Sequence, residues 1–249
     1  MCIRDRGRDA LAESVRAMKI PEALDKLSAM FGRMSKEMAQ DTKTVSYTHL
    51  DVYKRQDYHI IQECIADGVI FESNGRYHNA VFVGKDETGT PKYAAYRGLG
   101  SSTFKGDAYG SDKQYSFRLL AKEPCQSVHL FEAAIDLLSY ATLLKAQGKD
   151  YKAENLLSPS GVYQPKKENK DSKIPIALSV FLEKNPLIKT IHLHLDNDKT
   201  GRLCANTLKE LLRNKYEVFD EPPKKGKDYN DYLCIQLGIY KSKERSYER

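Results

Sequence analysis

The stretch that decides the fold lies in the C-terminal half of the chain and reads KTIHLHLDNDKTG, residues 189–201. Lys189–Leu195 is an apolar-rich run of strand length, and Asp196 and Asp198 follow it almost at once. From Thr200 to Arg213 the apolar positions recur at helical spacing, which predicts a helix after the acidic turn. The order strand, tight turn, helix is typical of a βαβ unit.

The same alternation of strand and helix runs through residues 126–238. Strands are expected at Ser127–Phe131, Asn155–Ser158, Lys189–Leu195 and Tyr216–Asp220, and helices at Ala133–Ala146, Pro175–Glu183 and Thr200–Arg213. Apolar strands separated by helices of about ten to fifteen residues predict an α/β fold with a Rossmann-like parallel sheet. Because the crossovers of such sheets are right-handed, the strands end at one common edge, where ligands bind.

A smaller α+β domain is expected to precede this sheet, over residues 57–125. It opens with a short helix that stops at Asp67-Gly68, since a glycine just past an apolar periodic segment ends a helix. Strands of a small antiparallel sheet are predicted at Val69–Glu72, Tyr77–Val83, Lys92–Arg97 and Tyr115–Leu119. Basic residues beside its turns either face solvent or hold a phosphate backbone.

The two ends of the chain carry no functional assignment. Residues 1–56 contain a helical pattern over residues 7–43, but residues 1–6 (MCIRDR) and 45–56 (VSYTHLDVYKRQ) resemble translated sequencing-adapter sequence. We therefore interpret residues 1–56 as a helical segment that is chimeric or artefactual. Residues 239–249 form a charged tail.

Composition excludes several classes of protein. The 249 residues carry a net charge of +6 with 30% charged positions, and no apolar run approaches the roughly eighteen residues of a membrane span. The five cysteines lie far apart without a C-x-x-C pair, which supports neither a zinc module nor a disulfide framework. We therefore expect a cytoplasmic protein without a membrane partner.

Carboxylates follow three of the predicted parallel strands. Glu132 follows the first strand, Asp196 and Asp198 follow the third, and Asp228 lies beyond the fourth. Each has a structural alternative as a helix cap or a helix-start charge. Gathered at one edge they repel one another unless a cation lies among them, and oxygen ligands favour Mg²⁺ or Mn²⁺ over zinc. The alternating His192 and His194 are interpreted as strand residues rather than ligands.

Three segments together resemble the Toprim domain: FEAAIDLLS (residues 131–139), LDNDKTG (residues 195–201) and GKDYND (residues 226–231). This domain is shared by bacterial-type primases, type IA and type II topoisomerases, overcoming-lysogenization-type nucleases and recombination-mediator proteins. The resemblance covers about residues 126–236. Residues 57–122 are similar to the domain that precedes Toprim in proteins of conjugative and mobilizable elements, and also to the basic strand region that precedes Toprim in primases.

The resemblance implies a role for individual residues. Glu132 would be a general acid/base or a metal-linked carboxylate, and Gly201 would allow the tight turn into the helix. The implied metal ligands are Asp196 and Asp198 with Asp228 as a further acidic contributor, and the implied phosphate, template or nucleotide contacts are Arg97, Lys105, Lys113 and Lys227. Two departures stand out: Glu132-Ala133 replaces the common Glu-Gly pair, and the cysteine-rich zinc module that usually leads such primases is missing.

The function expected from this resemblance is an enzyme, a Mg²⁺-dependent primase-like nucleotidyltransferase. It would join NTPs on single-stranded DNA during replication or transfer of a mobile element, with a helicase or relaxase of the same element as a partner. The same metal site with water as the nucleophile would make it a phosphodiester hydrolase. A non-catalytic nucleic-acid-binding module is the alternative outside the enzymes.

Overall fold

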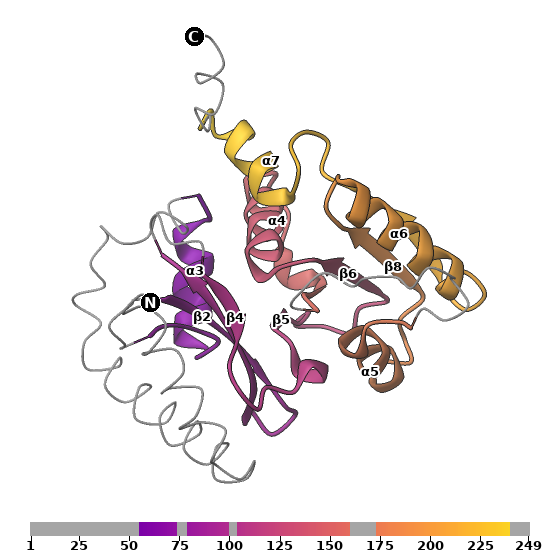
Figure 1. Cartoon of the computed structure of the whole chain (residues 1–249), viewed down its shortest axis with the longest axis horizontal. Helices are drawn as coiled ribbons and strands as arrows, with labels where there is room; N and C mark the ends of the chain where they lie inside the picture. Colours follow the sequence, from indigo (N-terminus) through magenta and orange to yellow (C-terminus); the bar gives the residue numbers. More distant parts are fainter. Residues whose placement is uncertain (1–54, 74–78, 100–103, 160–172, 240–249) are drawn as a thin grey trace, which may run out of the picture.

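The computed structural model describes residues 55–73, 79–99, 104–159 and 173–239, which form two β-sheets with helices around them (Figure 1). The predicted helix over residues 7–43 and the peptide 1–6 lie outside the described residues. So do all but two residues of the peptide 45–56 and all but one of the tail 239–249. The predicted fold class is confirmed, because an antiparallel sheet precedes a mostly parallel one.

The first sheet is antiparallel, with its strands in chain order. The strands are β1 (Ile70–Glu72), β2 (Asn79–Lys85), β3 (Pro91–Gly98) and β4 (Lys105–Asp107). Helix α3 (Tyr58–Ala66) precedes them and begins at Asp57, whose side chain accepts hydrogen bonds from the backbone N–H groups of His59 and Ile60. Such a cap satisfies helix donors that otherwise have no partner.

One strand prediction is wrong. Residues 115–119 were expected in this first sheet, but Lys113–Tyr115 forms a short 3-10 helix, η1, and Arg118–Leu119 forms β5 in the second sheet. Between them, Phe117 is fully buried and packs against Phe82 of the first sheet, with ring centroids 5.4 Å apart. The next two residues pair with β7 of the second sheet. The fourth strand of the first sheet is instead β4, which the sequence did not predict.

The second sheet has the strand order β5-β7-β6-β8-β9. Its longer strands are β6 (Ser127–Phe131), β7 (Asn155–Leu157), β8 (Thr190–His194) and β9 (Glu217–Asp220), which pair in parallel, while β5 pairs antiparallel with β7. A 3-10 turn, η2 (Tyr151–Ala153), leads into β7. The helices are α4 (Ala134–Ala146), α5 (Ile176–Lys184), α6 (Lys199–Leu212) and α7 (Tyr229–Gln236).

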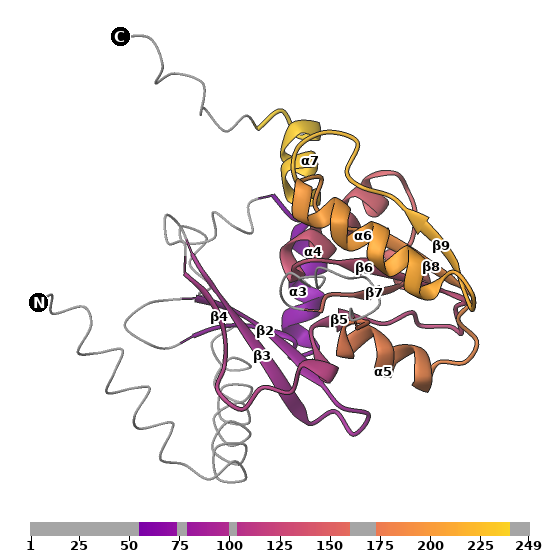
Figure 2. The same cartoon turned by 45° about the vertical axis from the view of Figure 1, so that its right-hand side comes forward.

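Helices cover both faces of the second sheet (Figure 2). Helices α5 and α6 pack on one face, over a buried cluster that includes Leu130 and Leu193. Helices α4 and α7 cover the opposite face, over Phe131. The neighbouring positions Leu130 and Phe131 thus belong to different clusters, as expected for side chains that alternate along a strand.

The two sheets share one hydrophobic core. Buried residues of the first sheet and its helix, such as Ile60 and Phe82, join the cluster that contains Phe131 of β6 and Leu137 of α4. Helix α4 therefore packs between the two sheets, as both views show (Figures 1 and 2). None of the helices in the described part of the chain is long and apolar enough to span a membrane.

Gly84 provides a test of how the first sheet contacts η1. A Cβ atom added to Gly84 would lie 1.5 Å from the backbone oxygen of Tyr115, whereas one added to Gly106 would meet its nearest neighbour, Phe104, at 3.8 Å. We predict that Gly84→Ala lowers the unfolding free energy by about 2–4 kcal/mol. Gly106→Ala, the matched control, should change it by less than about 1 kcal/mol. Urea unfolding checks this, and equal effects of both substitutions would contradict the close contact.

Candidate functional site

The acidic residues meet because β6 and β8 are neighbours in the parallel sheet. Phe131 pairs with His194 at the ends of the two strands, so that the residues that follow them leave the sheet side by side. Glu132 is the residue that follows β6, and Asp196 lies just beyond the end of β8. The backbone N–H of Asp196 donates a 3.0 Å hydrogen bond to Oε1 of Glu132, which joins the two strand ends directly.

Gly201 lies close to both the backbone of Asp196 and the carboxylate of Glu132. A Cβ atom at this position would lie 2.1 Å from the backbone oxygen of Asp196 and 2.9 Å from Oε1 of Glu132. Any larger residue would therefore push the first turn of α6 away from the carboxylates. The tight turn that the resemblance implied at Gly201 is the place where the first turn of α6 comes this close to Asp196 and Glu132.

Lys227 bridges the two aspartates. Its Nζ lies 3.2 Å from Oδ2 of Asp196 and 3.2 Å from Oδ2 of Asp198. Asp198 is also the N-cap of α6, because its Oδ1 accepts a 2.9 Å hydrogen bond from the backbone N–H of Gly201. The capping role and the charged site thus use different oxygens of the same carboxylate.

Burial and repulsion set the protonation of this group. Burial, with Asp196 as the next contribution, raises the pKa of Glu132 to about 7. Burial also raises the pKa of Asp196, although Lys227 opposes this. The backbone N–H of Gly201 and then Lys227 lower the pKa of Asp198, so that this carboxylate stays charged. The site therefore combines one carboxylate that stays ionised, Asp198, with one carboxyl group, Glu132, that titrates near neutral pH.

Asp136 is a further carboxyl group near the site, to which the sequence analysis assigned no role. It lies in the first turn of α4, is buried, and its Oδ1 accepts a 3.2 Å hydrogen bond from the backbone N–H of Asn230. Burial raises its pKa well above the usual range, and the charges of Asp228 and Asp196 raise it further. Its position one helical turn after Glu132 was the only signal in the sequence.

Asp228 has a structural role in the described conformation. Its side chain caps α7 by accepting a 2.7 Å hydrogen bond from the backbone N–H of Asp231. It follows Lys227 directly, and its charge acts on the pKa values of both Asp136 and Asp196. Asp228 therefore belongs to the electrostatic surroundings of the site.

Arg202 holds the turn that carries Asp196, and sequence reasoning missed it. The guanidinium donates hydrogen bonds to the backbone oxygens of Leu195 (2.7 Å) and Asp196 (3.1 Å). It also contacts both carboxylate oxygens of Asp220 at the end of β9, at 2.6 and 2.8 Å. The planar fork of arginine suits such multiple contacts. No sequence signal distinguished Arg202 from an ordinary surface arginine.

The basic residues predicted to bind nucleic acid lie apart from the carboxylates, in the first part of the described chain. Arg97 of β3 pairs in register with Lys105 of β4, so these two side chains are neighbours on the first sheet. Lys113 begins η1, and its ammonium group lies 3.1 Å from Oδ2 of Asp107. The structure thus brings Glu132, Asp196, Asp198 and Lys227 together, whereas these three basic residues belong to the first sheet and to η1.

The aspartate pair fits a divalent metal ion of the magnesium type. Mg²⁺ is commonly bound by one or two carboxylates and completes its coordination with water and substrate phosphates. Asp196 and Asp198 offer only oxygen atoms and already hold a cation, the ammonium group of Lys227, at 3.2 Å from each. As they stand, the described residues contain no group of three His, Cys, Asp or Glu side chains that converges on one metal position. Two carboxylates and an ammonium group thus face one another at this position.

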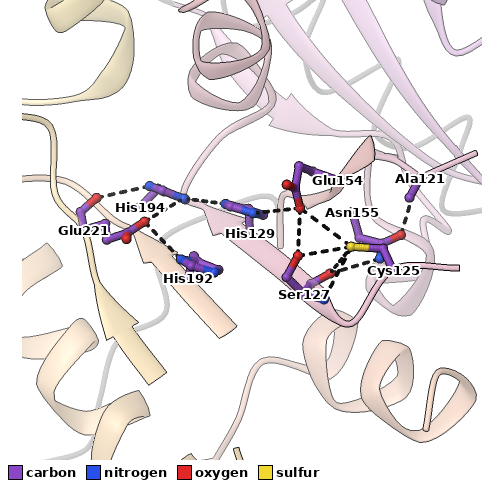
Figure 3. A network of polar contacts seen from close by, with 9 residues as sticks. All are labelled: Ala121, Cys125, Ser127, His129, Glu154, Asn155, His192, His194 and Glu221. Atoms are coloured by element: carbon purple, nitrogen blue, oxygen red, sulfur yellow. Dashed lines mark hydrogen bonds and ion pairs between the residues drawn. The ribbon is translucent and has the colours of Figure 1, made fainter. Parts of the chain in front are cut away.

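A cluster of histidines lies on the same sheet, on the neighbouring strands β6 and β8 (Figure 3). His129 of β6 and His192 of β8 pair in register, and their rings stack with centroids 4.4 Å apart and planes inclined by 6°. His194 stacks on His129 at 5.0 Å. The prediction that His192 and His194 share one face did not foresee that His129 lies against them.

These three rings are not arranged around a common metal ion. A coordinated ion lies in the plane of each imidazole, whereas the planes here are nearly parallel. The rings instead form a chain of polar contacts, in which Nδ1 of His129 lies 2.8 Å from Nε2 of His194 and Nε2 of His129 lies 3.3 Å from Glu154. At the other end, His194 reaches Glu221 (Figure 3). The cluster thus ties the central strands to the segments that flank them.

The family comparisons agree with the fold. Residues 129–233 match the family model described as Toprim-like, and residues 56–123 match the one described as a protein of unknown function, DUF3991. Residues 129–233 are thus similar to Toprim-like proteins, and the segment that precedes them is similar to DUF3991 proteins. This confirms the resemblance to Toprim proteins that the three sequence segments predicted.

Individual relatives extend over both domains. An uncharacterized Bacillus anthracis protein, pXO2-78, is 31% identical over 159 residues, or 58% of this chain and 40% of the relative, so the chain spans less than half of that protein's length. The RNA polymerase domain of the Mycobacterium tuberculosis primase superposes with a TM-score of 0.51 at 11% identity, over 87% of this chain and 77% of that one. The zinc-binding and RNA polymerase domains of the Aquifex aeolicus primase give 0.51 at 14% identity, over 90% and 60%. The chain thus shares the fold of these primase domains.

Glu154 offers a pH test of the histidine cluster. Hydrogen bonds from His129 and then Ser127 lower the pKa of Glu154 to about 2. A carboxylate with a depressed pKa stabilises the fold above its unfolded pKa of about 4.5 and loses this contribution as the pH falls toward 2. We predict that Glu154→Gln costs about 1–2 kcal/mol at pH 7, allowing for the partial exposure of the group. The cost should shrink at pH 3.

Chemical unfolding at pH 7 and pH 3 measures this difference. Glu210→Gln serves as the control, because Glu210 pairs with Arg213 on the exposed side of α6. It should change the unfolding free energy by less than about 0.5 kcal/mol at either pH. A cost of Glu154→Gln that is the same at both pH values would contradict the ionised contact with His129.

Proposed function

We propose that this protein is a Mg²⁺-dependent, primase-like nucleotidyltransferase that acts on single-stranded DNA in the replication or transfer of a mobile element. The observation that carries the proposal is the meeting of Glu132, Asp196 and Asp198 at the adjacent ends of β6 and β8. A cationic group already lies between the two aspartates. The Toprim-like family match and the shared primase fold support the same reaction class.

In this proposal, the carboxylates of the site have two different roles, metal binding and proton acceptance. Asp196 and Asp198 would hold Mg²⁺, which, when bound, would orient phosphate oxygens and neutralise their charge. Glu132, whose pKa is about 7, would accept the proton of the attacking 3′-hydroxyl group as it bonds to the α-phosphorus and pyrophosphate leaves. Arg202 keeps Asp196 in place through two backbone oxygens.

Substrate binding would use the basic residues. Lys227 reaches the aspartates from an exposed position, with 55% of its side chain accessible, and would contact a phosphate of the nucleotide. Arg97, Lys105 and Lys113 would contact the template strand through its phosphates, as lysines and arginines do in single-strand-binding grooves. We expect a helicase or relaxase of the same element to deliver the template.

Primer synthesis by the full chain tests the proposal. The protein is incubated with end-labelled single-stranded DNA, labelled NTPs and Mg²⁺ or Mn²⁺, and a denaturing gel reports synthesis and degradation together. We predict short RNA products, which Asp196→Asn reduces roughly 100-fold or more because it removes a metal ligand. DNA affinity should change by less than about threefold, since the template contacts lie elsewhere.

Glu217→Gln is the matched control, because Glu217 lies exposed at the start of β9 rather than at the end of a strand. It should leave synthesis unchanged. Shortened template that disappears in Asp196→Asn would instead make the protein a phosphodiester hydrolase. DNA binding without either product would make it a non-catalytic binding module.

A further inference from the structure

The loop between β9 and α7 is closed at its base by one histidine. Nδ1 of His194 lies 3.1 Å from the backbone oxygen of Glu221 and 2.9 Å from the hydroxyl group of Tyr229. The Tyr229 hydroxyl in turn donates a 3.0 Å hydrogen bond to the Glu221 oxygen. Residues 221 and 229, the two ends of the loop, are thereby held together at the end of β8.

The tip of the loop is fixed against the aspartates through its backbone. The backbone oxygen of Lys227 accepts a 2.6 Å hydrogen bond from the N–H of Asn197, which lies between Asp196 and Asp198. Gly226 adopts a φ of +82°, and a Cβ atom there would lie 2.8 Å from Cβ of Asp231. The peptide of Lys227 is therefore held next to the carboxylates however its side chain is placed.

The side chain of Lys227, by contrast, is held at the aspartates through exposed ion pairs. Its ammonium group is a compact charge on a flexible stem, and 55% of the side chain is accessible to solvent. Ion pairs of such exposed groups contribute at most about 1 kcal/mol each. Without this cation, however, the carboxylate of Asp196, which is only 14% accessible, would lose its ion-pair partner while it still faces the charge of Asp198.

A metal ion on the aspartates and the ammonium group of Lys227 exclude each other. Mg²⁺ and its substitutes bind carboxylate oxygens at about 2.1 Å, whereas the ammonium nitrogen lies 3.2 Å from the same two Oδ2 atoms. An ion bound to these oxygens would be within a few ångströms of a positive charge. Binding must therefore move Lys227 away from the aspartates.

We propose that Lys227 is a tethered counter-cation: it holds Asp196 and Asp198 together before a divalent ion binds, and the ion releases it toward the phosphate of the nucleotide. The inference rests on the metal site of the proposed function. It adds that the metal-free site is closed by the protein itself, so that the affinity for the ion reflects competition with Lys227. Because the backbone of Lys227 stays bonded to Asn197, the released ammonium group remains at the site.

Binding of Mn²⁺ to the full chain, measured without DNA or nucleotides by the loss of the free-ion paramagnetic resonance signal, tests this. Lys227→Met keeps an unbranched side chain that is one atom shorter and removes the competing charge. We predict that it binds Mn²⁺ about tenfold more tightly than the wild type. Its metal-free form should also melt at a temperature lower by a few degrees, because the carboxylates then repel one another.

Two further variants separate competition from a general change in charge. Lys225→Met removes an exposed lysine of the same loop and should change Mn²⁺ affinity by less than about twofold. Lys227→Arg keeps the cation and should retain the weak affinity of the wild type. Equal Mn²⁺ affinity of the wild type and Lys227→Met, or equal gains in Lys227→Met and Lys225→Met, would overturn the inference.

Asp196→Asn distinguishes this inference from the proposed function. If Asp196→Asn abolishes Mn²⁺ binding but Lys227→Met leaves it unchanged, the metal site is supported and the role of Lys227 as a counter-cation is wrong. If none of the proteins binds Mn²⁺, or if binding survives Asp196→Asn, both the metal site and the inference are wrong. If Lys227→Met binds Mn²⁺ more tightly than the wild type, and the double variant with Asp196→Asn does not bind it, the result supports both the metal site and the counter-cation.

Discussion

The parallel pairing of β6 with β8 is the constraint on which the site depends. Register between Phe131 and His194 makes the two strands end together, and the chain leaves them through Glu132 and Asp196, whose direct hydrogen bond joins the two ends. Like charges brought so close, and partly shielded from water, require a compensating cation. The turn around Gly201, the clamp by Arg202 and the loop that carries Lys227 all serve this one electrostatic arrangement.

The shared hydrophobic core connects the first sheet to the strand and helix on either side of Glu132. Helix α4 starts just after Glu132, buries Asp136 in its first turn and packs against the first sheet through the cluster that includes Ile60 and Phe82. Packed side chains therefore join the first sheet to the helix that follows Glu132.

Local patterns in the sequence predicted most elements of the second sheet and the acidic residues at the edge of that sheet. Apolar runs and helical spacing predicted β6, β8 and α6 to within a few residues, and acidic residues directly after strands predicted which ones would meet. What the sequence did not reveal depends on contacts between distant segments. The pairing of the short β5 with β7, the stacking of His129 on His192 and the bridge made by Lys227 each require the register of strands or the path of a loop, which local periodicity does not encode.

The central claim is that a divalent ion binds at the ends of β6 and β8. Iron-mediated cleavage tests it most directly: Fe²⁺ replaces Mg²⁺, and ascorbate then generates hydroxyl radicals that cut the backbone next to the bound ion. We predict cuts close to Glu132, around residues 196–198 and around residues 226–228. Excess Mg²⁺ should suppress these cuts, and Asp196→Asn should abolish them. Cleavage confined to other segments, or cuts that persist with Mg²⁺ and in Asp196→Asn, would contradict it.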